Sequence, residues 1–237
     1  MLDPKKLLDS FLGQQTSGTQ GDTGAMLRDG ASKATQMAKD NPLAAGALLA
    51  VLLGTGTGRK LTGKAVQVGG MAAIAGLAYK AWQDYQAGRQ PGETSARGGE
   101  LLPPPADTPF DPAQSPQGED EFALALLRAM IAAARADGHI DESERAKIAD
   151  RLRDSGIGQD ETAFMIAELE RPVDLDALIA AARTDAQKVE LYAASRLTIE
   201  PRTRAERGYL DMLAGRLGLP DALIDHVEAT VAENANL

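Results

Sequence analysis

The sequence contains no cysteine and only two histidines among its 237 residues, His139 and His226. Without cysteine the chain cannot form disulfides, thiolate metal sites or a cysteine nucleophile. Two histidines are too few for a multi-histidine zinc site, and His226 is expected on a helix surface or half buried. These absences exclude several kinds of catalytic and metal chemistry before any motif is considered.

Catalytic and nucleotide-binding motifs are also missing. Ser143 and Ser195 have no accompanying histidine and aspartate pattern, so a hydrolase triad has no support. The segment GTGTGRKLTGK at residues 54–64 does not complete the G-x-x-x-x-G-K-[ST] pattern of a phosphate-binding loop, and no strand pattern precedes it. The sequence therefore predicts a protein that is not an enzyme and binds no nucleotide.

Basic residues are scarce in the second half of the chain. Residues 119–237 carry 14 Lys and Arg against 24 Asp and Glu, residues 1–118 carry 11 against 10, and the net charge is −9. Nucleic-acid-binding domains present a basic surface, so no nucleic-acid partner is predicted. The acidic half would instead attract cations or a basic protein surface.

No apolar run reaches the roughly 20 residues that cross a bilayer as one helix. Residues 42–86 nevertheless hold two nearly uninterrupted apolar stretches, 43–53 and 65–82. Small residues recur in both at four-residue spacing, which lets helices approach closely, as in membrane helix pairs. These residues are Gly46, Ala50, Gly54 and Gly58 in and after the first stretch, and Ala65, Gly69 and Ala73 in the second.

Tyr79, Trp82 and Tyr85 gather beside Lys80 at the end of the second stretch, as is typical of a membrane interface. Two interpretations stay open. Residues 43–82 either contact the lipid bilayer, as a hairpin, an interrupted span or one tilted helix, or form a soluble Gly/Ala-rich hairpin that packs on itself or on a partner. The small-residue faces would support self-association.

The segments on either side of this region are polar or rich in proline. Residues 1–41 are predicted to be mostly flexible, apart from a short helix that Asp3 caps and Pro4 begins. Its apolar face consists of Leu7, Leu8, Phe11 and Leu12, and a docking helix or a frayed terminus is favoured over a membrane-surface anchor. Residues 87–118 hold seven of the twelve prolines and are predicted to be an extended linker.

Residues 119–237 show helical periodicity throughout and no alternating β-branched pattern. Pro172 ends one helix, and Asp or Thr caps precede several others. The clearest apolar stripe lies in EDEFALALLRAMIAAARAD and consists of Phe122, Leu126, Met130 and Ala133. About seven short helices are predicted, and together they form an all-α bundle large enough to bury a core.

The run ADGHIDESE at residues 136–144 has two explanations. Asp141 followed by Glu144 is the pattern of a capping box at a helix start, which requires no metal. Alternatively, Asp137, Asp141 and Glu144 converge as oxygen ligands for calcium or magnesium, with the carbonyl of His139 or a water completing the shell. The spacing does not fit an EF-hand loop.

The segment ARADGHIDESERAKIADRL resembles the signature of the TerB-like family, which is named for tellurite resistance and has all-helical members. A second segment, YAASRLTIEPRTRAERGYLDMLAGRLGLP, repeats the pattern, so that Glu206 corresponds to Glu144. With its Gly/Ala-rich region ahead of a proline-rich linker, the chain resembles the uncharacterised YebE-like branch of bacterial inner-membrane proteins. This implies an inner-membrane location with the C-terminal domain in the cytoplasm, the alternative being a soluble cytoplasmic protein.

TerB-like domains are thought to bind divalent cations through the acidic residues of two turns. Carried over to this sequence, the resemblance implies calcium or magnesium ligands at Asp137, Asp141, Glu144, Glu200 and Glu206. The second turn departs from the pattern, because it lacks Asp-Gly and contains Arg202 and Arg204. Either arginine could neutralise a neighbouring glutamate without an ion.

The function predicted from these features is that of a membrane-associated, non-enzymatic TerB-like protein. Its acidic helical domain would be a divalent-cation-responsive or protein-binding module, with a role in envelope or metal stress that rests on the resemblance alone. The alternative is a soluble, homo-oligomeric scaffold protein with no metal site.

Overall fold

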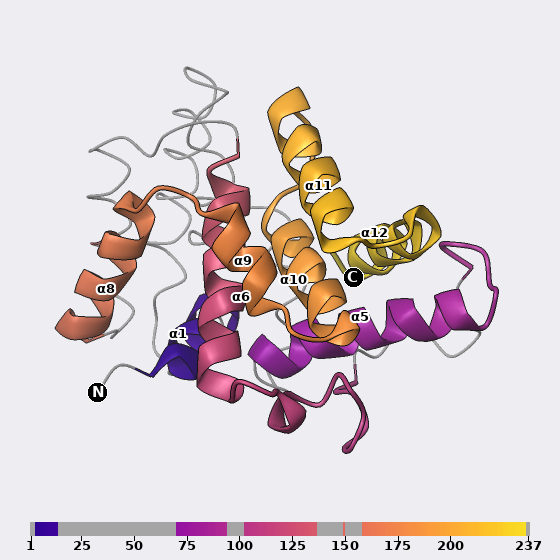
Figure 1. Cartoon of the computed structure of the whole chain (residues 1–237), viewed down its shortest axis with the longest axis horizontal. Helices are drawn as coiled ribbons and strands as arrows, with labels where there is room; N and C mark the ends of the chain where they lie inside the picture. Colours follow the sequence, from indigo (N-terminus) through magenta and orange to yellow (C-terminus); the bar gives the residue numbers. More distant parts are fainter. Residues whose placement is uncertain (1–2, 14–69, 94–101, 137–148, 150–157, 236–237) are drawn as a thin grey trace, which may run out of the picture.

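A computed structural model describes residues 3–13, 70–93, 102–136, 149 and 158–235, and every structural statement below concerns these residues (Figure 1). Within these ranges the chain is helical and has no strand, which confirms the predicted all-α class. The elements are α1 (Pro4–Gly13), α5 (Gly70–Gln86), the short 3-10 helix η1 (Pro112–Gln114), α6 (Glu119–Ala134), α8 (Gln159–Glu170), α9 (Leu175–Ala181), α10 (Asp185–Thr198), α11 (Arg204–Leu217) and α12 (Asp221–Ala235).

The helix ends follow the capping chemistry of the sequence. The side chains of Asp174, Thr184 and Thr203 each accept a hydrogen bond from a backbone N–H of the first turn of α9, α10 and α11. Gly218 ends α11 in the left-handed conformation with φ 69°, where a glycine has no Cβ to clash. Helix α8 ends just before Arg171, as the following proline predicts.

Helix α6 is the centre of the bundle, and its predicted stripe is confirmed as core. Phe122, Leu126 and Met130 are fully buried, and α10 packs along the helix through small residues. The hydroxyls of Ser195 on α10 and Tyr209 on α11 both donate to the carbonyl of Ala129, each at 3.4 Å. Alanine therefore lets these helices come close enough for side chains to reach a backbone oxygen.

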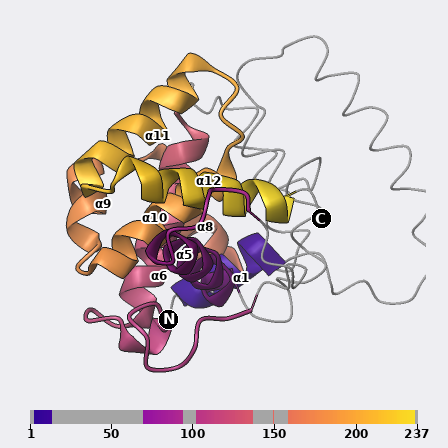
Figure 2. The same cartoon turned by 90° about the vertical axis from the view of Figure 1, so that its right-hand side faces the viewer.

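Helix α5 contains the second half of the apolar stretch at 65–82, and it packs against α1, α10 and α12 (Figure 2). Its residues Ala73 and Leu77 are buried under Leu197 of α10, and Lys80 pairs with Glu233 of α12 at 3.5 Å. None of the described helices is long and apolar enough to cross a membrane. Helices α1, α10 and α12 of the same chain therefore cover this part of the apolar stretch. Residues 43–69 lie outside the described residues.

The proline-rich segment packs on α5 through one aromatic side chain. Phe110 is buried, with its ring centroid 5.5 Å from that of Tyr79 and 6.2 Å from that of Trp82. Asp111 caps η1, where Pro112 begins the short helix. Residues 102–118 therefore cover the aromatic end of α5 instead of extending away from the bundle, and α5 and this segment share one core with α6 and α8 to α12.

The short N-terminal helix docks on the bundle, which is one of the alternatives left open by the sequence. The carboxylate of Asp3 accepts a hydrogen bond from the Lys6 N–H at 3.1 Å, and α1 begins at Pro4. Leu7 and Leu8 are buried against α5 and α6, and Lys5 forms an ion pair with Glu119 of α6. The bundle therefore includes residues from both ends of the chain.

Candidate functional site

The predicted metal ligands of the first turn, Asp137, Asp141 and Glu144, lie outside the described residues. Their role stays a prediction. The second turn is described, and it leads from α10 into α11. It brings Glu200 and Glu206 to one connection, where both are engaged by groups of the protein itself.

Glu206 forms a capping box with Thr203 at the start of α11. Its carboxylate accepts backbone N–H groups from Arg202 and Thr203 at 2.8 and 2.7 Å, and its own N–H donates to the Thr203 hydroxyl at 3.1 Å. Glu200 pairs with the guanidinium of Arg202 on the surface. Among the described residues no group of three or more acids and histidines could hold a metal ion.

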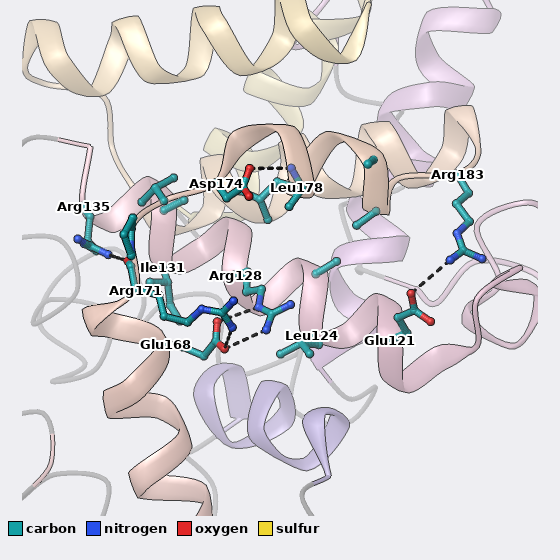
Figure 3. A pocket seen from close by; sticks show the side chains of 17 residues that line it. Glu121, Leu124, Arg128, Ile131, Arg135, Glu168, Arg171, Asp174, Leu178 and Arg183 are labelled. Carbon is teal, nitrogen blue, oxygen red and sulfur yellow. Dashed lines mark hydrogen bonds and ion pairs between the residues drawn. The ribbon is translucent and has the colours of Figure 1, made fainter.

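A pocket of about 440 Å³ lies between α6, α9 and the connection from α8 to α9 (Figure 3). Its apolar lining includes the buried side chains of Ile131 and Leu178. Val173, at the end of the connection, lines it as well and is 41% exposed, which is unusual among the large aliphatic residues that the structure describes. The pocket therefore offers an accessible apolar surface of the size at which proteins bind small groups.

Glu168 and two arginines form the charged end of the pocket. Arg128 donates through Nε at 2.8 Å and Nη2 at 2.9 Å to the two carboxylate oxygens, and Arg171 donates through Nη1 at 2.9 Å. The Glu168 side chain is only 6% exposed. The hydrogen bonds from Arg128, joined by those from Arg171, hold the pKa of Glu168 below its ordinary value against the opposing effect of burial.

Arg135 caps the C-terminal end of α6, seven residues after Arg128, and lies beside the same cluster (Figure 3). Its Nη1 donates to the carbonyl of Arg171 at 2.5 Å, whereas its Nε is buried and has no hydrogen-bond partner. At the other end of the pocket Arg183 pairs with Glu121 at 3.3 Å. The lining thus contains four arginines and three carboxylates, the third being Asp174, and no described carboxylate pairs with Arg135.

The sequence analysis missed this pocket, because its charged residues are spread over 63 positions from Glu121 to Arg183. The spacing of two arginines in the sequence indicated part of the pocket. Arg128 and Arg135 are seven residues apart, so they share one face of a helix whose other faces are apolar. Only the packing of α8 and α9 shows which residues meet that face.

Two further buried polar residues lie outside the pocket. His226 of α12 is buried, with its ring 6.2 Å from that of Tyr85, so the expectation of a helix-surface or half-buried histidine was wrong. Glu190 of α10 is 3% exposed, and burial alone raises its pKa well above the ordinary value. Neither residue belongs to a group of acids and histidines that could hold a metal ion among the described residues.

A family model described as "Protein of unknown function (DUF533)" matches residues 38–231. This chain belongs to the DUF533 family. The matched range includes the apolar stretches, the proline-rich segment and the residues that line the pocket.

A relative in Yersinia enterocolitica, described as "Uncharacterized protein in ampR 5'region", is similar to this DUF533 protein. It is 28% identical over 114 residues, which are 48% of this chain and 82% of the relative. No solved structure matches. These similarities identify the family and assign no activity to it.

Proposed function

We propose that this DUF533 protein is a non-enzymatic protein-binding module that takes a segment of a partner protein into the pocket between α6, α8 and α9. The observation that carries the proposal is the combination of exposed aliphatic surface at Val173 with the arginine cluster around Glu168. Arginine beside apolar surface is characteristic of the anchoring centres of protein interfaces.

The contacts that hold the walls of the pocket together support this proposal. Its floor is α6, which is buried along most of its length, and Glu168 ties α8 to α6 through two hydrogen bonds from Arg128. A preformed pocket loses little conformational entropy when a partner binds. Helix α9 closes the opposite side and is capped by Asp174, whose carboxylate accepts the Ala177 N–H at 2.9 Å.

The location is proposed from the resemblance to TerB-like proteins, the YebE-like branch in particular. We place the protein at the bacterial inner membrane, with the apolar residues ahead of α5 in contact with lipid and the bundle in the cytoplasm, in envelope or metal stress. A soluble homo-oligomer is the alternative. Extraction of cell membranes with alkaline carbonate separates them, because a lipid-inserted protein stays in the pellet and a soluble scaffold does not.

A second candidate function, divalent-cation binding, is favoured by the acidic residues of the run ADGHIDESE. The test is calorimetry of the purified full chain with calcium and magnesium. A true site in the first turn predicts heat of binding that both Asp137→Ala and Glu144→Ala abolish, while Glu200→Ala leaves it unchanged. Equal heats for all variants would leave the capping box as the explanation of Asp141 and Glu144.

Protein binding itself is tested in cells by placing a photo-crosslinking amino acid at Val173. The matched control carries it at Met212, which is 46% exposed on α11 and lies outside the pocket. We expect a discrete protein adduct at position 173 that is absent at position 212 and is lost when Arg135→Glu is added. The same adducts at both positions, or none at position 173, would contradict the proposal.

A further inference from the structure

We infer that the pocket recognises a single carboxylate next to an aliphatic side chain, presented by a short acidic segment of the partner protein. This inference rests on the proposed protein-binding function and specifies the chemistry of the partner. It depends on three features of the pocket: its unused N–H donors, its net charge and its exposed aliphatic surface.

The unused donors belong to Arg135 and Arg171. A guanidinium has five N–H groups, and Arg171 uses Nη1 for Glu168, while Arg135 uses Nη1 for the carbonyl of Arg171. The Nε of Arg135 is buried without an acceptor, a condition that proteins usually avoid. A carboxylate oxygen that displaces the groups covering this Nε would provide the missing acceptor, in the geometry that Arg128 and Glu168 already show within the protein.

The net charge of the lining fits one carboxylate. Four arginines face three carboxylates there, which leaves one positive charge when all are ionised. A phosphate group would bring more negative charge than the lining can neutralise, and would meet Glu168 and Asp174 in the same pocket. The charge balance therefore favours a monoanion.

The aliphatic surface defines the second contact. Val173 is 41% exposed, and the side chains of Ile131 and Leu178 lie deeper in the lining. A Leu, Ile or Val side chain next to an Asp or Glu would cover Val173 while the carboxylate reaches Arg135. A volume of about 440 Å³ is suited to one or two side chains and not to a folded domain.

A peptide segment fits these features better than a bilayer or a nucleic acid. The half of the chain that holds the pocket has 24 acidic against 14 basic residues, so an extended polyanion would be repelled outside the pocket. The surface of an anionic bilayer would be repelled for the same reason. A flexible segment with one acidic residue can enter the pocket and keep the rest of its length away from the acidic surface.

The experiment measures peptide binding to the purified full chain by fluorescence anisotropy. The probe is a labelled Ser/Gly peptide that carries a central Leu-Glu-Leu, and its matched control has Leu-Gln-Leu. We expect the Glu peptide to bind at least about ten times more tightly, because a charge-assisted hydrogen bond is lost with Gln. Arg135→Gln should weaken binding of the Glu peptide to a similar degree, whereas Arg202→Gln, outside the pocket, should leave it unchanged.

Thermal melting of each variant establishes that the fold is intact, and decanoate serves as a competitor that offers a carboxylate without a peptide. Equal binding of the two peptides, or unchanged binding by Arg135→Gln, overturns the inference. Tighter binding of decanoate than of the Glu peptide also overturns it, in favour of a small-molecule ligand. If no peptide binds while Val173 still crosslinks a partner, the inference fails and the proposed protein-binding function stands.

Discussion

Two of the regions in which a glutamate pairs with an arginine differ in how the pairing is made. At the turn before α11, Glu200 and Glu206 are engaged by groups no more than four residues away in the sequence. At the pocket, Arg128 reaches Glu168 across 40 residues, and two further arginines lie alongside. In the turn, each glutamate carboxylate is bound by a group close in sequence. At the pocket, residues remote in sequence form the cavity, and the Nε of Arg135 has no hydrogen-bond acceptor. The glutamates of the turn are thus engaged in local contacts of the fold, and the arginines of the pocket are the residues that we propose to bind a partner carboxylate.

The largest expected effect is that of Glu168→Ala. The side chain is 6% exposed and holds both Arg128 and Arg171, so its loss leaves two guanidinium groups without their carboxylate. Because both arginines are partly exposed to water, we expect a loss of about 2–3 kcal/mol in the free energy of unfolding, less than for a fully buried pair. Urea denaturation measures it.

Glu200→Ala is the matched control for that substitution. Its pair with Arg202 is exposed, so the change should stay within about 0.5 kcal/mol. If Glu200→Ala lowered the free energy of unfolding as much as Glu168→Ala, the ion pairs of the turn and of the pocket would not differ in their contribution to stability.

An intermediate effect is expected at the capping box. Glu206→Ala removes the acceptor of two backbone N–H groups and should cost about 1 kcal/mol, while Glu206→Gln keeps an acceptor and should cost less. The measurement is urea denaturation with and without calcium. Calcium protection of the parent that is lost in Glu206→Gln would indicate a metal ligand and contradict a purely structural role.

A further prediction distinguishes the buried carboxyl groups of Glu168 and Glu190 by the pH dependence of their contributions to stability. The pKa of Glu168 is lowered, so its contribution to stability is present above the ordinary value of 4.5 and is lost as the pH falls through its folded pKa. The pKa of Glu190 is raised, so stability declines as the pH rises from 4.5 toward its folded pKa.

Glu190→Gln should therefore stabilise the protein at pH 7, by about 1 kcal/mol or more, and have little effect at pH 4. Thermal melting of the parent and the variant across this pH range is the measurement. A variant that is destabilised at pH 7 would mean that the ionised carboxylate is needed in the folded state.

Local chemistry made much of the fold predictable. The stripe on α6, the caps at Asp174, Thr184 and Thr203, and the stop at Pro172 depend only on residues close in sequence. The N-terminal helix could be predicted for the same reason, because Asp3, Pro4 and its leucines are adjacent.

The environment of α5 was not predictable by such rules. A helix with apolar residues on most of its faces suits a bilayer and a protein core equally well. The deciding contacts are with Leu197, Glu233 and Phe110, which are remote in sequence. The pocket could not be predicted for the same reason. Helical periodicity shows that Arg128 and Arg135 share a face, but it does not show which helices cover that face.

The most direct test of the central claim is an NMR titration of the labelled full chain with the Leu-Glu-Leu peptide. The account predicts that the Nε–H resonance of Arg135 and the methyl resonances of Val173 shift on addition of the peptide. The methyl resonance of Met212 should stay in place, and the Leu-Gln-Leu peptide should produce little change. Equal shifts with both peptides, or none at Arg135 and Val173, would contradict the assignment of the pocket as a carboxylate-binding site for a partner segment.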